Sequence, residues 1–87
     1  RGIMLDCGGG LLEIFANATD VPDKGALRHI AFATDDPDGC LAAVRRAGYP
    51  VIEEPHDITI PAATPFPARI AFCKGPVGET IEFFCEK

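Results

Sequence analysis

The stretch LRHIAFATDDPDGCLAAVRRAG, residues 27–48, decides the fold. Its first part, Leu27–Thr34, is apolar and rich in Ile, Phe and small residues, which is typical of a β-strand. Asp36 and Pro37 then supply an N-cap and a first helical residue, so a helix is expected to begin there. The apolar residues of this helix form one stripe, and Gly48 is placed to end it. The stretch therefore predicts a strand followed by an amphipathic helix that packs on a sheet.

Three further strands are expected after the helix, which gives the order βαβββ from Leu27 onward. Pro55 cannot donate a hydrogen bond to a neighbouring strand, so the first of the three is expected to be broken or bulged there. The proline-rich segment Pro61–Ala68 predicts a loop, and the glycines and proline of Lys74–Gly78 predict a hairpin turn. The expected strands are Val51–Ile60, Arg69–Cys73 and Thr80–Cys85.

The segment before residue 27 resembles the end of the chain. Gly2–Asp6, a glycine-rich turn and Leu11–Ala16 align with the last two strands and their turn, and Glu13 then matches Glu82. This repeat favours an internal duplication. We therefore expect an α+β domain over residues 1–87, with residues 1–16 as the β-hairpin end of a first module, 17–26 as a linker loop and 27–87 as a complete second module.

Composition limits the possible partners. The chain has 87 residues, enough for one domain, with 47% hydrophobic residues and a formal net charge of −5. No basic run could follow a nucleic acid backbone, and no apolar run approaches the roughly 20 residues of a membrane helix. The four cysteines form no CxxC pair and no regular spacing, which favours free thiols. We expect a soluble cytoplasmic protein that binds neither nucleic acid nor membranes.

Three side chains could form a site that binds a metal ion. Glu13 and Glu82 are charged residues in the middle of apolar strands, and His29 has small residues beside it on its face of the strand. Two carboxylates and an imidazole suit Zn, Ni, Co, Mn or Fe in the divalent state, and three protein ligands leave positions for water or substrate. The alternative is that the glutamates face solvent at strand edges and that the histidine is a core residue with a satisfied hydrogen bond.

Two other polar residues have more than one interpretation. His56 could supply a missing ligand, although a histidine that faces solvent in a turn is favoured. Arg69 begins a strand, where it could bind a substrate carboxylate or extend to the rim of the sheet.

The segments GALRHIAFATDD and GPVGETIEFF resemble the second module of the vicinal oxygen chelate superfamily, which includes glyoxalase I, methylmalonyl-CoA epimerase, extradiol dioxygenases and bleomycin resistance proteins. The resemblance implies two βαβββ modules whose curved mixed sheet holds a divalent metal. It implies His29 as the first-strand ligand, Glu82 as the last-strand ligand and Glu13 as the last-strand ligand of the first module. The family's fourth ligand and the first module's helix would precede Arg1, so the N-terminal part of the first module is expected to be absent.

The resemblance is strongest to lactoylglutathione lyase-like members. It implies a metal-dependent glyoxalase I-like lyase or isomerase, with Ni or Zn favoured, in which Glu82 transfers a proton through a metal-stabilised enediolate. Two alternatives remain open, which are a metal-free ligand-binding protein of the antibiotic-sequestering type and a methylmalonyl-CoA epimerase-like enzyme. The expected partners are a small-molecule substrate and a second copy of the chain in a homodimer.

Overall fold

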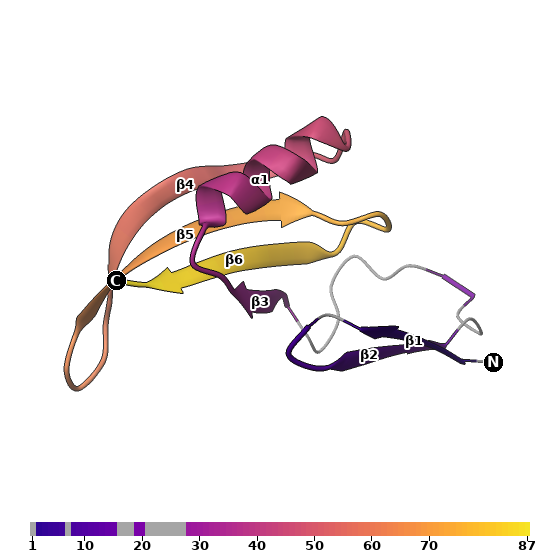
Figure 1. The fold of residues 1–87 in the computed structure, drawn as a ribbon, viewed down its shortest axis with the longest axis horizontal. Helices are drawn as coiled ribbons and strands as arrows, with labels where there is room; N and C mark the ends of the chain where they lie inside the picture. Colours follow the sequence, from indigo (N-terminus) through magenta and orange to yellow (C-terminus); the bar gives the residue numbers. More distant parts are fainter. Residues whose placement is uncertain (1, 7, 16–18, 21–27) are drawn as a thin grey trace.

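The computed structural model describes residues 2–6, 8–15, 19–20 and 28–87, with the side chains of residues 2, 3 and 13–15 left undescribed. Figure 1 shows a curved sheet with one helix on one face, next to a separate hairpin. The expected α+β class and the order βαβββ are confirmed. The elements are β1 (Gly2–Asp6), β2 (Leu11–Phe15), β3 (Ile30–Ala33), α1 (Pro37–Arg46), β4 (Val51–Ile60), β5 (Phe66–Lys74) and β6 (Thr80–Glu86).

The larger sheet is mixed and has the strand order β3-β6-β5-β4. β3 pairs with β6 in parallel, and β6, β5 and β4 pair antiparallel. The parallel pair brings the strand before the helix beside the last strand of the chain. Residues 31 and 82, far apart in the sequence, are therefore direct neighbours in the sheet.

Helix α1 has the predicted ends. The Asp36 side chain accepts a hydrogen bond from the backbone N–H of Gly39 at 3.0 Å, and Pro37 occupies the first turn. Arg45 and Arg46 lie in the last turn, where their charge opposes the negative end of the helix dipole. Gly48 has a φ of 91°, the left-handed conformation in which glycine commonly ends a helix.

The core lies between α1 and one face of the sheet. Leu41 from the helix is 1% exposed and packs with Ala71 and Cys73 of β5. Because side chains alternate along a strand, the residues that alternate with them point to the opposite face, which no helix of the described residues covers. Val44, Val51, Ile81 and Phe83 complete the core around this cluster.

The predicted loop Pro61–Ala68 is wrong in its second half, because β5 begins at Phe66 and includes Pro67. The carbonyl of Pro67 accepts a hydrogen bond from the backbone of Lys87 at 3.0 Å. In an antiparallel sheet the backbone N and O of one residue face the same neighbouring strand. The nitrogen of Pro67, which carries no hydrogen, therefore faces Lys87 and not β4, so no hydrogen bond to β4 is lost. A proline is tolerated at such a position.

The first strand of the module is also shorter than predicted. β3 covers Ile30–Ala33 rather than Leu27–Thr34, and its residues pair with β6 from Ile81 onward. Since β6 begins at Thr80, Arg28, the described residue before His29, lies beyond the start of β6. At the other end the hydroxyl of Thr34 accepts a hydrogen bond from the backbone of Asp36, which turns the chain into the helix. Leu27 lies outside the described residues.

Strand β4 has the irregularity expected at Pro55. Its register with β5 shifts between Glu53 and His56, and also between Val51 and Glu53. Each shift places one extra residue in β4 opposite its partner strand, which is the property of a β-bulge. The bulged strand forms one edge of the curved sheet.

The hairpin β1–β2 forms a sheet of its own, with Gly8 at a φ of 89° in the turn. Among the described residues, β1 and β2 contact each other and no element of the larger sheet. Ala16 and most of the predicted linker 17–26 lie outside the described residues, so the division into two modules stays a prediction. Within the described part of the chain, no helix is long and apolar enough to cross a membrane.

Candidate functional site

His29 and Glu82, which are far apart in the sequence, lie together on the sheet face opposite α1. Glu82 occupies the middle of β6, with Ala31 of β3 and Phe72 of β5 as its register partners. His29 comes directly before β3, one residue short of the strand in which it was predicted. Ala31, with its small side chain, is the neighbour of Glu82 on β3.

The geometry of the pair is that of a hydrogen bond. His29 Nε2 lies 3.0 Å from Oε1 of Glu82, so the imidazole donates and the carboxylate accepts. The Glu82 side chain is 12% exposed and that of His29 is 42% exposed. The imidazole also meets the ring of Phe72 edge to face, with centroids 5.5 Å apart. These two contacts orient the imidazole above a carboxylate that is largely withdrawn from water.

A nitrogen and a carboxylate oxygen at this separation are suitable donors for a divalent metal ion of the Zn or Ni type. The sequence analysis predicted both as ligands, and the structure brings them together. The side chain of the third predicted ligand, Glu13, lies outside the described residues, although its backbone pairs with Met4 in the hairpin. Among the side chains that are described, no group of three or more potential ligands gathers at one point.

The surface around the pair is apolar toward the far end of β6. Ile70 of β5 is 7% exposed, and Phe66 and Phe84 meet edge to face with centroids 6.5 Å apart. Beyond them, an open hollow of about 480 Å³ lies at the ends of β3 and β6. The lining of this hollow does not include His29 or Glu82. We therefore assign the candidate site to the imidazole–carboxylate pair, whose nitrogen and oxygen atoms can bind a metal ion or transfer a proton. The hollow is lined by Ala33, Thr34, Asp35, Phe84, Cys85 and Glu86.

Lys74 is a polar residue of this face that the sequence analysis did not select. Its ammonium donates a hydrogen bond to the hydroxyl of Thr80 at 3.2 Å. Lys74 and Thr80 are register partners, as are Phe72 and Glu82 two residues further along. The alternation of side chains along the two strands could have identified Lys74 from the sequence, since it places Lys74 on the same face as Glu82. A cation therefore lies on the face that carries the site.

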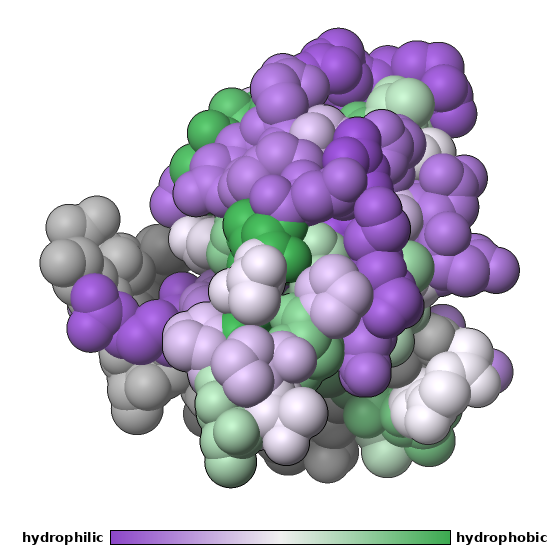
Figure 2. Space-filling model, turned by 90° about the vertical axis from the view of Figure 1, so that its left-hand side faces the viewer, coloured by the Kyte–Doolittle hydropathy of each residue, from purple (hydrophilic) through white to green (hydrophobic). Residues whose placement is uncertain are grey.

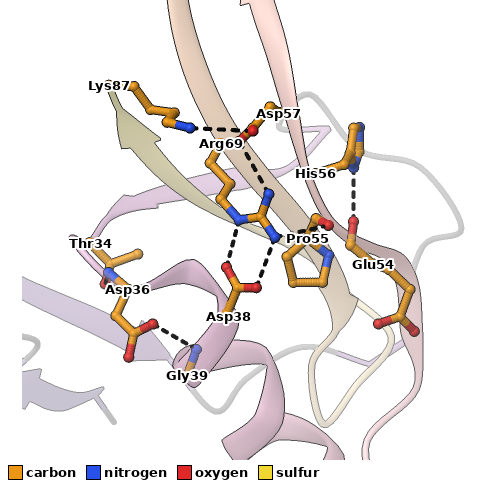
Figure 3. Close-up of polar contacts among 10 residues, drawn as sticks. All are labelled: Thr34, Asp36, Asp38, Gly39, Glu54, Pro55, His56, Asp57, Arg69 and Lys87. Carbon is orange, nitrogen blue, oxygen red and sulfur yellow. Dashed lines mark hydrogen bonds and ion pairs between the residues drawn. The ribbon is translucent and has the colours of Figure 1, made fainter.

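Arg69 faces the helix rather than the site, so it is not available to a ligand bound there. Its guanidinium donates to both carboxylate oxygens of Asp38, at 2.6 and 2.8 Å, and to Asp57 at 3.1 Å (Figure 3). These hydrogen bonds lower the pKa of both carboxyl groups and raise that of Arg69 above its ordinary value. Lys87 also pairs with Asp57. The cluster joins the start of α1 to β4, β5 and the last residue.

The remaining candidates lie away from the pair. His56 shares the sheet face of His29 but lies on β4, at the other edge of the sheet. Cys73 is 1% exposed in the core, and burial raises the pKa of its thiol, which agrees with a packing role rather than a nucleophilic one.

The outer surface of the molecule differs between the side of α1 and the part below it. Figure 2 shows hydrophilic residues over much of its upper part, on the side of α1, and apolar residues in patches below. Helix α1 buries Leu41 against the sheet and leaves Arg45 and Arg46 exposed.

Comparison with known proteins gives one result. The chain matches the model of the Glyoxalase/Bleomycin resistance protein/Dioxygenase superfamily over residues 1–83. A search of curated proteins found no match. The family match covers the hairpin, the βαβββ unit as far as residue 83 in β6, and both members of the His29–Glu82 pair. The chain belongs to the Glyoxalase/Bleomycin resistance protein/Dioxygenase superfamily.

Proposed function

We propose that this chain contributes to a metal-dependent glyoxalase I-like lyase or isomerase, in which a carboxylate moves a proton on a small oxygen-rich substrate. The observation that carries the proposal is the His29–Glu82 pair, which lies 3.0 Å apart on the open face of the sheet. A carboxylate that is 12% exposed on an apolar surface is costly for folding, and a binding or catalytic role explains why it is kept.

The donor set of the pair fits a divalent metal ion. Glu82 and His29 would hold it, together with Glu13, with Ni and Zn favoured and Co, Mn or Fe as further candidates. When bound, such an ion stabilises negative charge on the substrate oxygens. His29 can bind a metal through Nε2 only as the neutral imidazole with its proton on Nδ1, and a doubly protonated ring offers no lone pair, so binding should be weaker at low pH.

In this proposal Glu82 is the base that removes a proton from one carbon of the substrate and returns it to the adjacent carbon. Its place in the middle of β6 keeps the carboxylate on a rigid element, and the ring of Phe72 lies against His29. The Glu82 carboxylate is 12% exposed, and a carboxylate that is largely withdrawn from water interacts more strongly with nearby charges. Lys74, on the same face, adds a positive charge near an anionic substrate group.

The proposal is tested by titrating the chain with Ni²⁺ and Zn²⁺ in a calorimeter. We expect the native chain to lose one stoichiometric ion, the one held at the His29–Glu82 pair, when Glu13→Gln, His29→Ala and Glu82→Gln are combined. Glu86→Gln is the matched control, because it changes an exposed glutamate of the same strand. Equal affinity in the native chain and the combined variant would contradict the metal site. Turnover of methylglyoxal–glutathione hemithioacetal that survives Glu82→Gln would contradict the catalytic role.

The second candidate is a metal-free binding protein of the antibiotic-sequestering type. The apolar face formed by Phe66, Phe84 and Ile70 favours it, since such a surface binds a ligand without an ion. Ligand binding that is unchanged by a chelator would support this candidate over the lyase. A methylmalonyl-CoA epimerase-like enzyme is the remaining alternative, and a panel of acyl-CoA and hemithioacetal substrates separates it from the lyase.

We also propose a homodimer in the cytoplasm. Met4, Leu5 and Leu11 of the hairpin are 59%, 46% and 62% exposed, and a two-stranded sheet is marginally stable by itself in water. A second copy of the chain would cover these residues. The free thiols of Cys40 and Cys73 agree with a reducing compartment. A sedimentation experiment that finds only folded monomer would contradict the dimer.

A further inference from the structure

A second imidazole–carboxylate pair, Glu53–His56, lies on the same sheet face as the first, at the opposite edge. Residues three apart on a regular strand point to opposite faces. The bulge in β4 changes this, because Glu53 pairs with Phe72 and His56 pairs with Ile70. Phe72 and Ile70 alternate along β5 with the core residues Ala71 and Cys73, so both partners face away from α1. The bulge therefore brings an imidazole and a carboxylate together on the open face.

The hydrogen bonding of His56 determines which ring nitrogen carries the proton. Nδ1 lies 2.8 Å from the backbone carbonyl oxygen of Glu54, and a carbonyl can only accept, so Nδ1 is the donor (Figure 3). In the neutral imidazole Nε2 then carries a lone pair. Nε2 lies 3.6 Å from Oε2 of Glu53, which is beyond the length of a hydrogen bond.

Two acceptors that face each other at this separation repel unless a cation lies between them. A divalent zinc-type ion lies about 2.1 Å from both nitrogen and oxygen ligands, so two ligands of a tetrahedral site are about 3.4 Å apart. The observed 3.6 Å is close to this value. Hydrogen bonding of the second imidazole nitrogen to a backbone carbonyl is also the usual way in which a protein orients a histidine ligand.

We propose that Glu53 and His56 bind a divalent transition-metal ion of the zinc type, at a site separate from His29 and Glu82. Both side chains are about half exposed, at 49% and 46%, so the ion can enter from solvent and keep water in its remaining positions. The carboxylate of Glu54 does not compete for it, because that side chain forms an ion pair with Arg45 of the helix. With two protein ligands the site should bind more weakly than a three-ligand site.

Zn²⁺ titration of variants tests the proposal. In the background Glu13→Gln, His29→Ala and Glu82→Gln, which removes the other predicted ligands, we expect one bound Zn²⁺ to remain. Adding His56→Ala or Glu53→Gln to this background should weaken that binding at least tenfold. If Glu53→Gln leaves the affinity unchanged, the ion binds to a lone histidine and the proposed pair is refuted. If no Zn²⁺ binds in the background, the site is refuted while the His29–Glu82 proposal is unaffected.

Nitrogen NMR of the imidazoles provides a second measurement, made on the native chain once the two imidazoles are assigned. The chain has two histidines, so assignment by one substitution is sufficient. At pH 8 without metal, His56 is expected as the Nδ1–H tautomer, and Zn²⁺ should shift its Nε2 resonance. An Nε2–H tautomer, or an Nε2 resonance that saturating Zn²⁺ does not move, would overturn the proposal.

Discussion

Replacing Glu82 with methionine should stabilise the fold while removing metal binding at the His29–Glu82 pair. The substitution removes the hydrogen bond with His29, worth about 1.5–3 kcal/mol for a charged acceptor. It gains about 1.5–3 kcal/mol by burying an apolar side chain at a position that is 12% exposed. It also removes the cost of withdrawing the carboxylate from water, and replacement of buried charges by apolar residues is often stabilising. His29 is 42% exposed and can be hydrated after the change. We expect a net gain of about 1 kcal/mol.

Urea unfolding followed by circular dichroism measures this gain. With a slope of about 1–2 kcal/mol per molar urea, the midpoint should rise by about 0.5–1 M at pH 8. Glu86→Met, on the same strand but exposed, is the control and should change the free energy of unfolding by less than about 0.5 kcal/mol. A midpoint that falls in Glu82→Met by a similar amount would refute the reasoning. The pair would then be a structural hydrogen bond rather than a site kept at a cost to stability.

Three further predictions concern the face of the sheet that packs against α1. Hydrogen bonds from Arg69 lower the pKa of Asp38 and Asp57 below the usual 3.8, so their contribution to stability is present above that pH and is lost as the pH falls through the folded-state values. The urea midpoint should therefore fall less between pH 5 and pH 2 in Asp38→Asn/Asp57→Asn than in the native chain, and an equal fall would contradict the role of the cluster. Leu41→Ala should lower the free energy of unfolding by about 3 kcal/mol, since a core leucine that is 1% exposed loses both its transfer energy and its contacts, whereas a loss below about 1 kcal/mol would show that the core is not centred there. Cys73, buried and with a raised pKa, should react with a thiol reagent only on unfolding, and native-state labelling located there by mass spectrometry would contradict its core position.

Local signals were sufficient to predict most of the fold. The cap at Asp36, the proline at the first helical position and the glycine at residue 48 act within a few residues, so they identify α1 without its neighbours. The segment Pro61–Ala68 shows where such reasoning fails. Whether Pro67 can lie in a strand depends on which neighbour its missing N–H would face, and only the arrangement of β4, β5 and β6 determines that.

The candidate site could be predicted only in part, for a related reason. Alternation of side chains along the strands places His29 and Glu82 on the face away from the helix, but their contact depends on the parallel pairing of β3 with β6. Glu53 and His56 could not be placed together from the sequence, since their spacing predicts opposite faces. Pro55 indicated the bulge, and only the register with β5 shows that it brings the two onto one face.

One face of the sheet packs against α1 and stabilises the fold, whereas the other face holds the proposed ion-binding pairs. This difference explains why charged residues are retained on the second face. Leu41 and Cys73 bury apolar surface on the helix face, where a change of volume lowers stability. On the open face, Glu82 is held by a hydrogen bond, whereas Glu53 and His56 leave a lone pair facing a carboxylate. Binding of an ion through Nε2 at the first pair requires the imidazole proton to move from Nε2 to Nδ1. At the second pair the proton already lies on Nδ1, and an ion relieves a repulsion. Zn²⁺ should therefore change the tautomer of His29 and leave that of His56 unchanged, a difference that nitrogen NMR of the imidazoles would measure.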